Sequence, residues 1–165
     1  MNNLTVGVKF FRKERFIRFG TISQTSYCPR RSENKLMLQH KHLIITAKVK
    51  HAPRDVDYIQ DWLRLLIKQI DMEILMGPYA VYYDVPGNKG ITAFSIITTS
   101  HIGLHTFEEG EGEPTRFELD VYSCKDFDIN DVFNALKEFE IIEASYKFLD
   151  RENNLNTISF GHNPP

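Results

Sequence analysis

Residues 52–71 read APRDVDYIQDWLRLLIKQID, and this stretch decides which fold classes are open to the chain. Pro53 and Asp55 stand where helix starts commonly carry them. After them, apolar residues recur at intervals of three and four, which is the period of one helix face. These residues are Val56, Ile59, Trp62, Leu63, Leu66, Ile67 and Ile70. Because an apolar stripe of this width must be buried, we expect the helix to cover a sheet.

Strand-like runs occupy much of the remaining sequence, before and after this helix. They lie within residues 36–49, 72–85, 90–100, 101–107, 115–124 and 141–149. A second helix is predicted from Ile129 to Phe139, with Asp128 as its cap. Strands in succession between two helices predict an α+β fold, a two-layer sandwich with an antiparallel sheet and two main helices on one face.

Residues 4–22, LTVGVKFFRKERFIRFGTI, contain two β-prone runs around a charged RKER segment. This pattern predicts an extra N-terminal β-hairpin within residues 1–35. At the other end, we expect a frayed tail after the last strand. A length of 165 residues suits one domain. We therefore expect a single domain over residues 1–165, with its core in 36–150.

Composition narrows the possible partners. The formal net charge is -2 and hydrophobic residues make up 42% of the chain. A protein without a basic excess is a poor ligand for nucleic acid, and no apolar run is long enough for a membrane helix. Cys28 and Cys124 are far apart and lack CxxC spacing, so we expect two reduced thiols in the cytoplasm. The composition therefore leaves two function classes, a reaction on a small molecule or binding to another protein.

Residues 98–107, TTSHIGLHTF, place a serine and two histidines in a β-prone run. Polar side chains in a half-buried strand cost stability unless each finds a partner, so this run is either an edge strand or a site. A single histidine or cysteine is usually structural. The informative feature is the order of Ser100, His101, His105 and Cys124 along the chain.

This order resembles the prokaryotic S-adenosylmethionine decarboxylases. In that family a serine-histidine pair is followed by a histidine-threonine pair, an aromatic residue and a glutamate, and later by an aspartate and an aromatic-hydroxyl-cysteine turn. The matching residues are Ser100, His101, His105, Thr106, Phe107, Glu109, Asp120, Tyr122, Ser123 and Cys124. HLIIT at 42–46 and GIT at 90–92 extend the resemblance over residues 40–150.

The resemblance implies a self-processing, pyruvoyl-dependent enzyme that decarboxylates S-adenosylmethionine for spermidine synthesis. The Ser100 hydroxyl would attack the Thr99 carbonyl, the chain would break between these residues, and Ser100 would become a covalent pyruvoyl group. The resemblance assigns assistance in this processing to His105 and Thr92. Strand alternation puts Ser100 and His105 on opposite faces, so a bulge or turn near Ser100 would be needed to bring them together.

The resemblance also implies roles in the mature enzyme. The pyruvoyl group would form a Schiff base with the substrate's amino group and accept electrons, and Cys124 would supply a proton. Glu109 would bind the ribose hydroxyls, while Phe107, Tyr82 or Tyr83 would stack on the adenine. Members of the family assemble from processed protomers, which implies a homo-oligomer.

Three alternatives stay open. A remodelled pocket could decarboxylate ornithine or arginine, with the acidic residues 108–113 binding the second amino group. Thr99 stands where the family has glutamate, which favours an unprocessed homologue that binds S-adenosylmethionine or regulates a partner. The third alternative is a metal site formed by His40, His42, His101 and His105. No carboxylate or cysteine pair of standard spacing accompanies these histidines, so we expect no metal.

Overall fold

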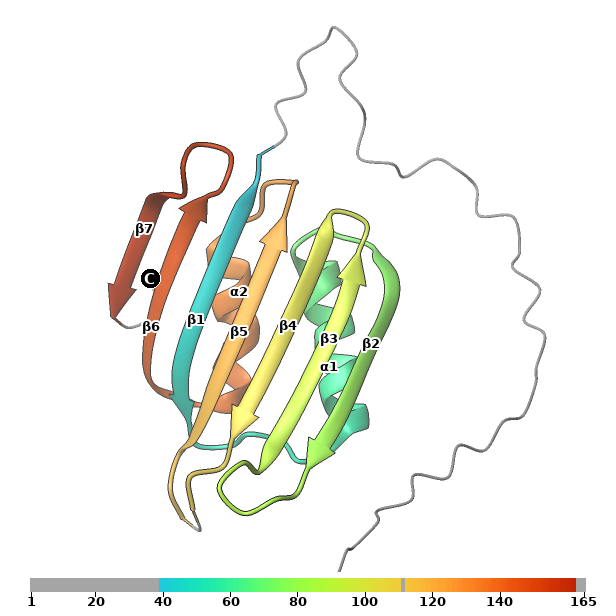
Figure 1. The fold of residues 1–165 in the computed structure, drawn as a ribbon, viewed down its shortest axis with the longest axis vertical. Coiled ribbons are helices and arrows are strands. Elements are labelled where there is room, and N and C mark those ends of the chain that lie inside the picture. Colours follow the sequence, from blue (N-terminus) through green and yellow to red (C-terminus); the bar gives the residue numbers. More distant parts are fainter. Residues whose placement is uncertain (1–38, 111, 163–165) are drawn as a thin grey trace, which may run out of the picture.

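The computed structural model describes residues 39–110 and 112–162 (Figure 1). These residues form a seven-stranded antiparallel sheet in the order β2-β3-β4-β5-β1-β6-β7. The strands are β1 (Lys41–Val49), β2 (Ile74–Tyr83), β3 (Gly90–Ile97), β4 (Ser100–Phe107), β5 (Thr115–Ser123), β6 (Ile141–Asp150) and β7 (Asn156–His162). Both α-helices lie behind the sheet in Figure 1, which confirms the predicted α+β architecture.

Helix α1 (Val56–Gln69) begins where the sequence predicts. The Asp55 side chain caps it by accepting hydrogen bonds from the backbone N–H groups of Asp57 and Tyr58. The buried residues of the helix are Ile59, Trp62, Leu63, Leu66 and Ile67. The Trp62 ring meets the ring of Phe117 on β5 edge to face, with centroids 5.9 Å apart. The apolar stripe of α1 therefore packs on the sheet, as expected.

Helix α2 (Ile129–Leu136) covers the same face of the sheet (Figure 1). Asp128 accepts a hydrogen bond from the backbone N–H of Asn130, which confirms it as the cap. A short 3-10 helix, η1 (Lys137–Phe139), continues directly from α2. The predicted helical span of 129–139 is thus correct, although its last turn is tighter than an α-helix.

The end of the described chain differs from our prediction, because a strand replaces the expected frayed tail. Strand β7 pairs with β6 from the Ser145–His162 pair at one end to the Asp150–Asn156 pair at the other. Asp150 organises the intervening turn by accepting hydrogen bonds from the backbone N–H groups of Glu152 and Asn153. Residues 156–162 carry asparagine and glycine on either side of a short β-prone run, and pairing with β6 stabilises them as a strand.

The predicted N-terminal hairpin, within residues 1–35, lies outside the described residues. In the part of the chain that is described, no helix is both long and apolar enough to cross a bilayer.

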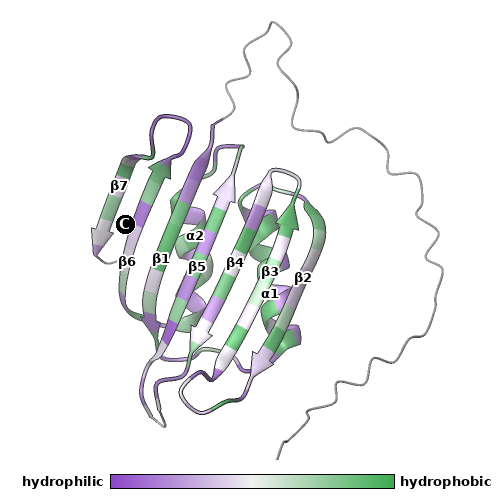
Figure 2. Cartoon of the chain, in the orientation of Figure 1, coloured by the Kyte–Doolittle hydropathy of each residue, from purple (hydrophilic) through white to green (hydrophobic). Residues whose placement is uncertain are grey.

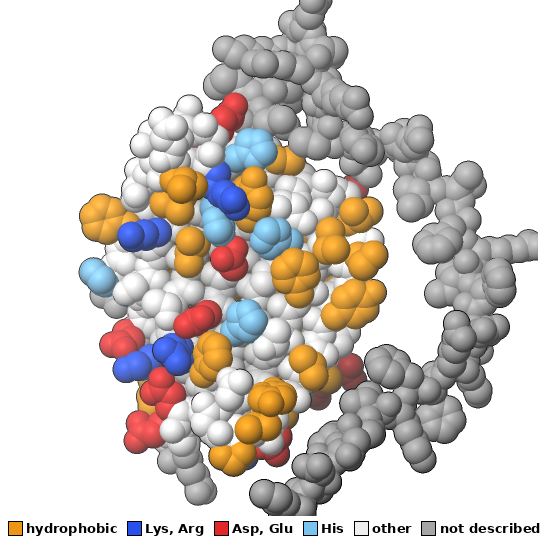
Figure 3. All heavy atoms as spheres, viewed as in Figure 1, with side chains coloured by type: hydrophobic (Ala, Val, Ile, Leu, Met, Phe, Trp, Pro, Cys, Tyr) orange, Lys and Arg blue, Asp and Glu red, His pale blue; other side chains and the backbone are white. Residues whose placement is uncertain are grey.

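The face of the sheet opposite the helices is open. Along β3, Thr92, Phe94 and Ile96 are exposed, whereas their neighbours in sequence are buried against the helices. Figure 2 shows hydrophilic and hydrophobic residues alternating along β5, where Phe117, Leu119 and Val121 are buried. Exposed hydrophobic side chains gather over β2 and β3 beside a group of histidines (Figure 3). We call Tyr79, Val81, Tyr83, Phe94 and Ile96 the apolar patch. Exposed patches of this kind mark interaction surfaces.

Candidate active site

The expected cleavage bond lies in the tight turn between β3 and β4. Thr98 and Thr99 form this turn, and Ile97 pairs with Ser100 across it. Ser100 has a φ of 153°, in a region that residues with a side chain rarely adopt. Strain of this kind costs energy and persists where the surrounding structure enforces it, commonly at functional sites. The Thr99–Ser100 bond is therefore held in an unusual conformation.

A backbone donor points at the carbonyl that would be attacked. The Thr99 carbonyl oxygen accepts a hydrogen bond from the Cys124 backbone N–H, with an N···O distance of 2.9 Å. Pairing of Ser100 with Ser123 on β5 places Cys124 there. A donor in this position stabilises negative charge on the oxygen when a nucleophile adds to the carbonyl. Sequence analysis pointed to the Cys124 side chain, but only the strand register reveals this backbone contact.

His101 is the histidine that contacts Ser100. Its Nδ1 lies 3.2 Å from Ser100 Oγ. The His101 ring stacks on Phe94, with centroids 5.3 Å apart, and meets the Tyr122 ring edge to face at 5.6 Å. The sequence motif includes His101 but assigns it no part in processing, and periodicity carries no signal for this contact between adjacent residues.

His105 lies elsewhere, beside Thr92. Its Nδ1 is 3.1 Å from Thr92 Oγ1, so the structure brings these two predicted processing residues together. It does not bring them to Ser100. Strand β4 pairs with both neighbours without a register shift, so five strand positions separate Ser100 from His105 by about 17 Å. The turn that we expected is present, but it precedes Ser100 and cannot fold the strand back. Our expectation of a contact within one chain is wrong.

Phe107 and Glu109 extend the His105 group at the far end of β4. The Phe107 ring stacks with His105 at a centroid distance of 6.2 Å, and the Arg116 guanidinium lies 5.0 Å from its centre. Glu109 Oε1 is 4.0 Å from Arg116 Nε, and Glu109 also borders a hollow of about 790 Å³. Glu109 lines this hollow and Phe107 does not, although both groups, a carboxylate and an aromatic ring, are of the kind that binds a nucleoside.

The two candidate tyrosines lie on opposite faces of the sheet. Tyr83 belongs to the exposed apolar patch, whereas Tyr82 packs against the helix-covered core. The Tyr82 hydroxyl donates a hydrogen bond of 2.8 Å to Glu108. Tyr82 is therefore separated from the surface that carries His105, whereas Phe107 and Tyr83, the other two candidates for stacking on adenine, are not on the helix-covered side.

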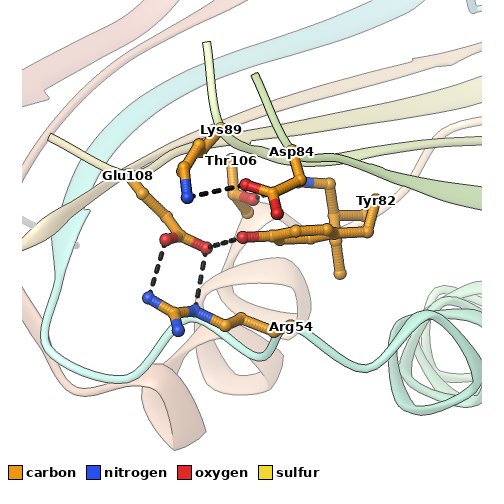
Figure 4. Close-up of polar contacts among 7 residues, drawn as sticks. Arg54, Tyr82, Asp84, Lys89, Thr106 and Glu108 are labelled. Carbon is orange, nitrogen blue, oxygen red and sulfur yellow. Dashed lines mark hydrogen bonds and ion pairs between the residues drawn. The ribbon is translucent and has the colours of Figure 1, made fainter. Parts of the chain in front are cut away.

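Glu108 anchors the end of β4 in a network that sequence analysis missed (Figure 4). It accepts two hydrogen bonds from Arg54, of 2.9 and 2.7 Å, and one from Tyr82. Hydrogen bonding to Glu108 raises the pKa of Tyr82 and of Arg54. Lys89 and Asp84 form an ion pair of 2.6 Å next to this group. Because Arg54 and Tyr82 are 54 and 26 positions from Glu108, no local pattern indicates the network.

The metal alternative has no support in residues 39–110 and 112–162. Within them, no three His, Cys, Asp or Glu side chains form a group that could hold an ion. His40 Nδ1 instead lies 2.9 Å from the Tyr122 hydroxyl, and His42 Nε2 lies 2.5 Å from Asp120 Oδ1. Both histidines lie beside Tyr122, so they share a face of the sheet.

Comparison with known proteins identifies the family and the fold. The family model for S-adenosylmethionine decarboxylase matches residues 41–152, which include the turn at Ser100, His105 and Cys124. Among solved structures, the chain is similar to the adenosylmethionine decarboxylase from Aquifex aeolicus, with a TM-score of 0.51 and 19% sequence identity. That alignment covers 69% of this chain and 91% of the other, and it shows a shared fold. No curated protein sequence matches. Because the family model spans well over half of the chain, the protein belongs to the S-adenosylmethionine decarboxylase family.

Proposed function

We propose that the protein is a self-processing, pyruvoyl-dependent decarboxylase of S-adenosylmethionine, whose product serves spermidine synthesis. The observation that carries the proposal is the Thr99–Ser100 bond. Ser100 has a strained backbone, and the Thr99 carbonyl oxygen already accepts a hydrogen bond from the Cys124 N–H. Family membership supports the choice of substrate.

Self-processing needs groups that the chain provides and one water molecule. The Ser100 hydroxyl adds to the Thr99 carbonyl carbon, and the Cys124 N–H stabilises the resulting oxyanion. The Thr99–Ser100 carbon-nitrogen bond then breaks, the nitrogen takes a proton, and an ester replaces the amide. Loss of the Ser100 Cα proton expels the Thr99 carboxylate, and water then replaces the nitrogen as ammonia. The products are residues 1–99 and a chain from position 100 that begins with a pyruvoyl group.

The residues around position 100 fit such a group. It would supply a carbonyl that draws electrons away from the substrate carbon as carbon dioxide leaves. Cys124, held at this turn by its backbone contact with Thr99, would donate the proton that replaces carbon dioxide on that carbon. Glu109 would accept hydrogen bonds from the ribose hydroxyls, while Phe107 and Tyr83 offer aromatic faces to the adenine.

A second copy of the chain completes the site in this proposal. Ser100 stands at the start of β4, and the group of Thr92, His105, Phe107 and Glu109 lies toward the other end of this strand. Two sheets can stack with these faces together, about a two-fold axis that crosses the strands near Gly103. Gly103 is close to the midpoint between Ser100 and His105, so each His105 then lies near the other copy's turn at Ser100. The same stacking buries the apolar patch, which is otherwise exposed to water.

The test is carbon dioxide release from substrates with a labelled carboxyl group. We expect release from S-adenosylmethionine and none from ornithine or arginine. Release from ornithine or arginine, without release from S-adenosylmethionine, would favour a decarboxylase of basic amino acids. Binding of S-adenosylmethionine to an intact chain without release would favour the unprocessed homologue.

Cys124→Ala is expected to separate processing from turnover. Cleavage should continue, because alanine keeps the backbone N–H that contacts the Thr99 carbonyl. Turnover should fall by about 100-fold or more, the usual effect of losing a positioned proton donor. Intact mass measures the first effect and labelled carbon dioxide the second. Turnover within a few-fold of the wild type would remove Cys124 from the reaction.

A further inference from the structure

We propose that His101 is a catalytic residue of self-cleavage, which takes the Ser100 hydroxyl proton within the same copy of the chain. This inference rests on the proposed self-processing and assigns a step that His105 of that copy is too distant to perform. Its starting point is the 3.2 Å separation of Ser100 Oγ and His101 Nδ1, in a strand that starts with Ser100 itself.

The surroundings hold the His101 ring in place. One side stacks on Phe94, at an interplanar angle of 24°, and the Tyr122 ring approaches at 73°. The Tyr122 hydroxyl is 2.9 Å from His40 Nδ1, and the Arg151 guanidinium lies 4.0 Å from the centre of the Tyr122 ring. A base that is already oriented loses less conformational entropy when it reacts. Phe94 and Tyr122 are therefore positioning residues for His101.

The proposed step conserves protons. As Ser100 Oγ bonds to the Thr99 carbonyl carbon, its proton passes to His101 Nδ1. As the Thr99–Ser100 carbon-nitrogen bond breaks, His101 returns this proton to the Ser100 nitrogen. The imidazole ends neutral, the carbonyl oxygen regains its double bond, and the product is the ester. Histidine suits this role because an imidazole nitrogen can accept a proton and then return it.

The test uses two substitutions of His101 in the full chain, followed by intact mass over time. His101→Phe keeps an aromatic ring between Phe94 and Tyr122 but removes both nitrogens. His101→Ala leaves space for added imidazole. We expect cleavage to slow by about 100-fold or more in both variants, and imidazole to restore part of the rate in His101→Ala. If Tyr122 positions His101 through its ring, Tyr122→Leu should slow cleavage. Tyr122→Phe, which keeps the ring, should cleave close to the wild-type rate.

The matched control is His162→Phe. His162 Nδ1 lies 2.9 Å from Ser145 Oγ, which is a similar serine-histidine contact at the exposed edge of the sheet. This variant should cleave at the wild-type rate. Hydroxylamine cleaves esters but not amides, so it shows whether a variant stops before or after the ester forms. It should release no fragment from the His101 variants, because their ester does not form. Cleavage of His101→Phe within two-fold of the wild type would overturn the proposal, as would a slow His101→Ala that imidazole leaves unchanged.

Co-expression separates this inference from the proposed function. A His101→Phe chain should stay intact even when a Ser100→Ala chain, which keeps His101 and His105, is present. Rescue of His101→Phe by that partner would show that His101 does not act within its own copy. If the wild-type chain itself stays intact and hydroxylamine releases no fragment, self-processing fails as a whole, which is a different outcome from a normal rate in the His101 variants.

Discussion

Ser100→Ala is expected to leave one intact chain of 19.2 kDa, whereas the wild-type protein should become two fragments that meet at Thr99 and Ser100. Alanine has no hydroxyl to add to the Thr99 carbonyl, so neither the ester nor the pyruvoyl group can form. Without that group the variant has no electron sink, and decarboxylation should be undetectable. Intact mass measures both the cleavage and the altered terminus of the second fragment.

Ser145→Ala is the matched control for this experiment. Ser145 also contacts a histidine, but β6 places it in the middle of a strand and away from the turn at Ser100. This variant should be cleaved like the wild type. A wild-type protein that stays in one piece after prolonged incubation would remove the pyruvoyl group from the proposal. The unprocessed homologue, which Thr99 suggested, would then be the better interpretation.

His105→Ala and Ser100→Ala are each expected to be uncleaved alone and to restore cleavage when the two chains are produced together. In a mixed dimer, the His105→Ala chain keeps Ser100 and receives a histidine from its partner. Random pairing would place about half of the Ser100-bearing chains in such dimers, so about half should be cleaved. The physical reason is the separation of about 17 Å along β4, which no single copy can close.

The control replaces the rescuing chain with the double variant Ser100→Ala, His105→Ala, which has no histidine to contribute. Cleavage should then be absent. Mixed dimers that co-purify but stay intact would show that His105 does not act across the two copies. A His105→Ala chain that is processed normally by itself would exclude His105 from processing altogether.

Local patterns predicted much of the fold. The three-and-four spacing from Val56 to Ile70 placed α1, because only one helix face can pack on a sheet. Asp128 marked the start of α2 through its capping chemistry. Strand β7 escaped prediction because its conformation depends on hydrogen bonds with β6, a partner that no local window contains.

The sequence by itself determined the α+β class, the family motif and the identity of the groups available for chemistry, because periodicity and residue order are local properties. Only the tertiary structure decided which of these groups meet. The register of β4 against β5 gives the Thr99 carbonyl the Cys124 N–H, the backbone at Ser100 brings its hydroxyl to His101, and the extended course of β4 separates Ser100 from His105. A shift of one residue would move every side chain to the other face, so register, which long-range pairing fixes, decides the site.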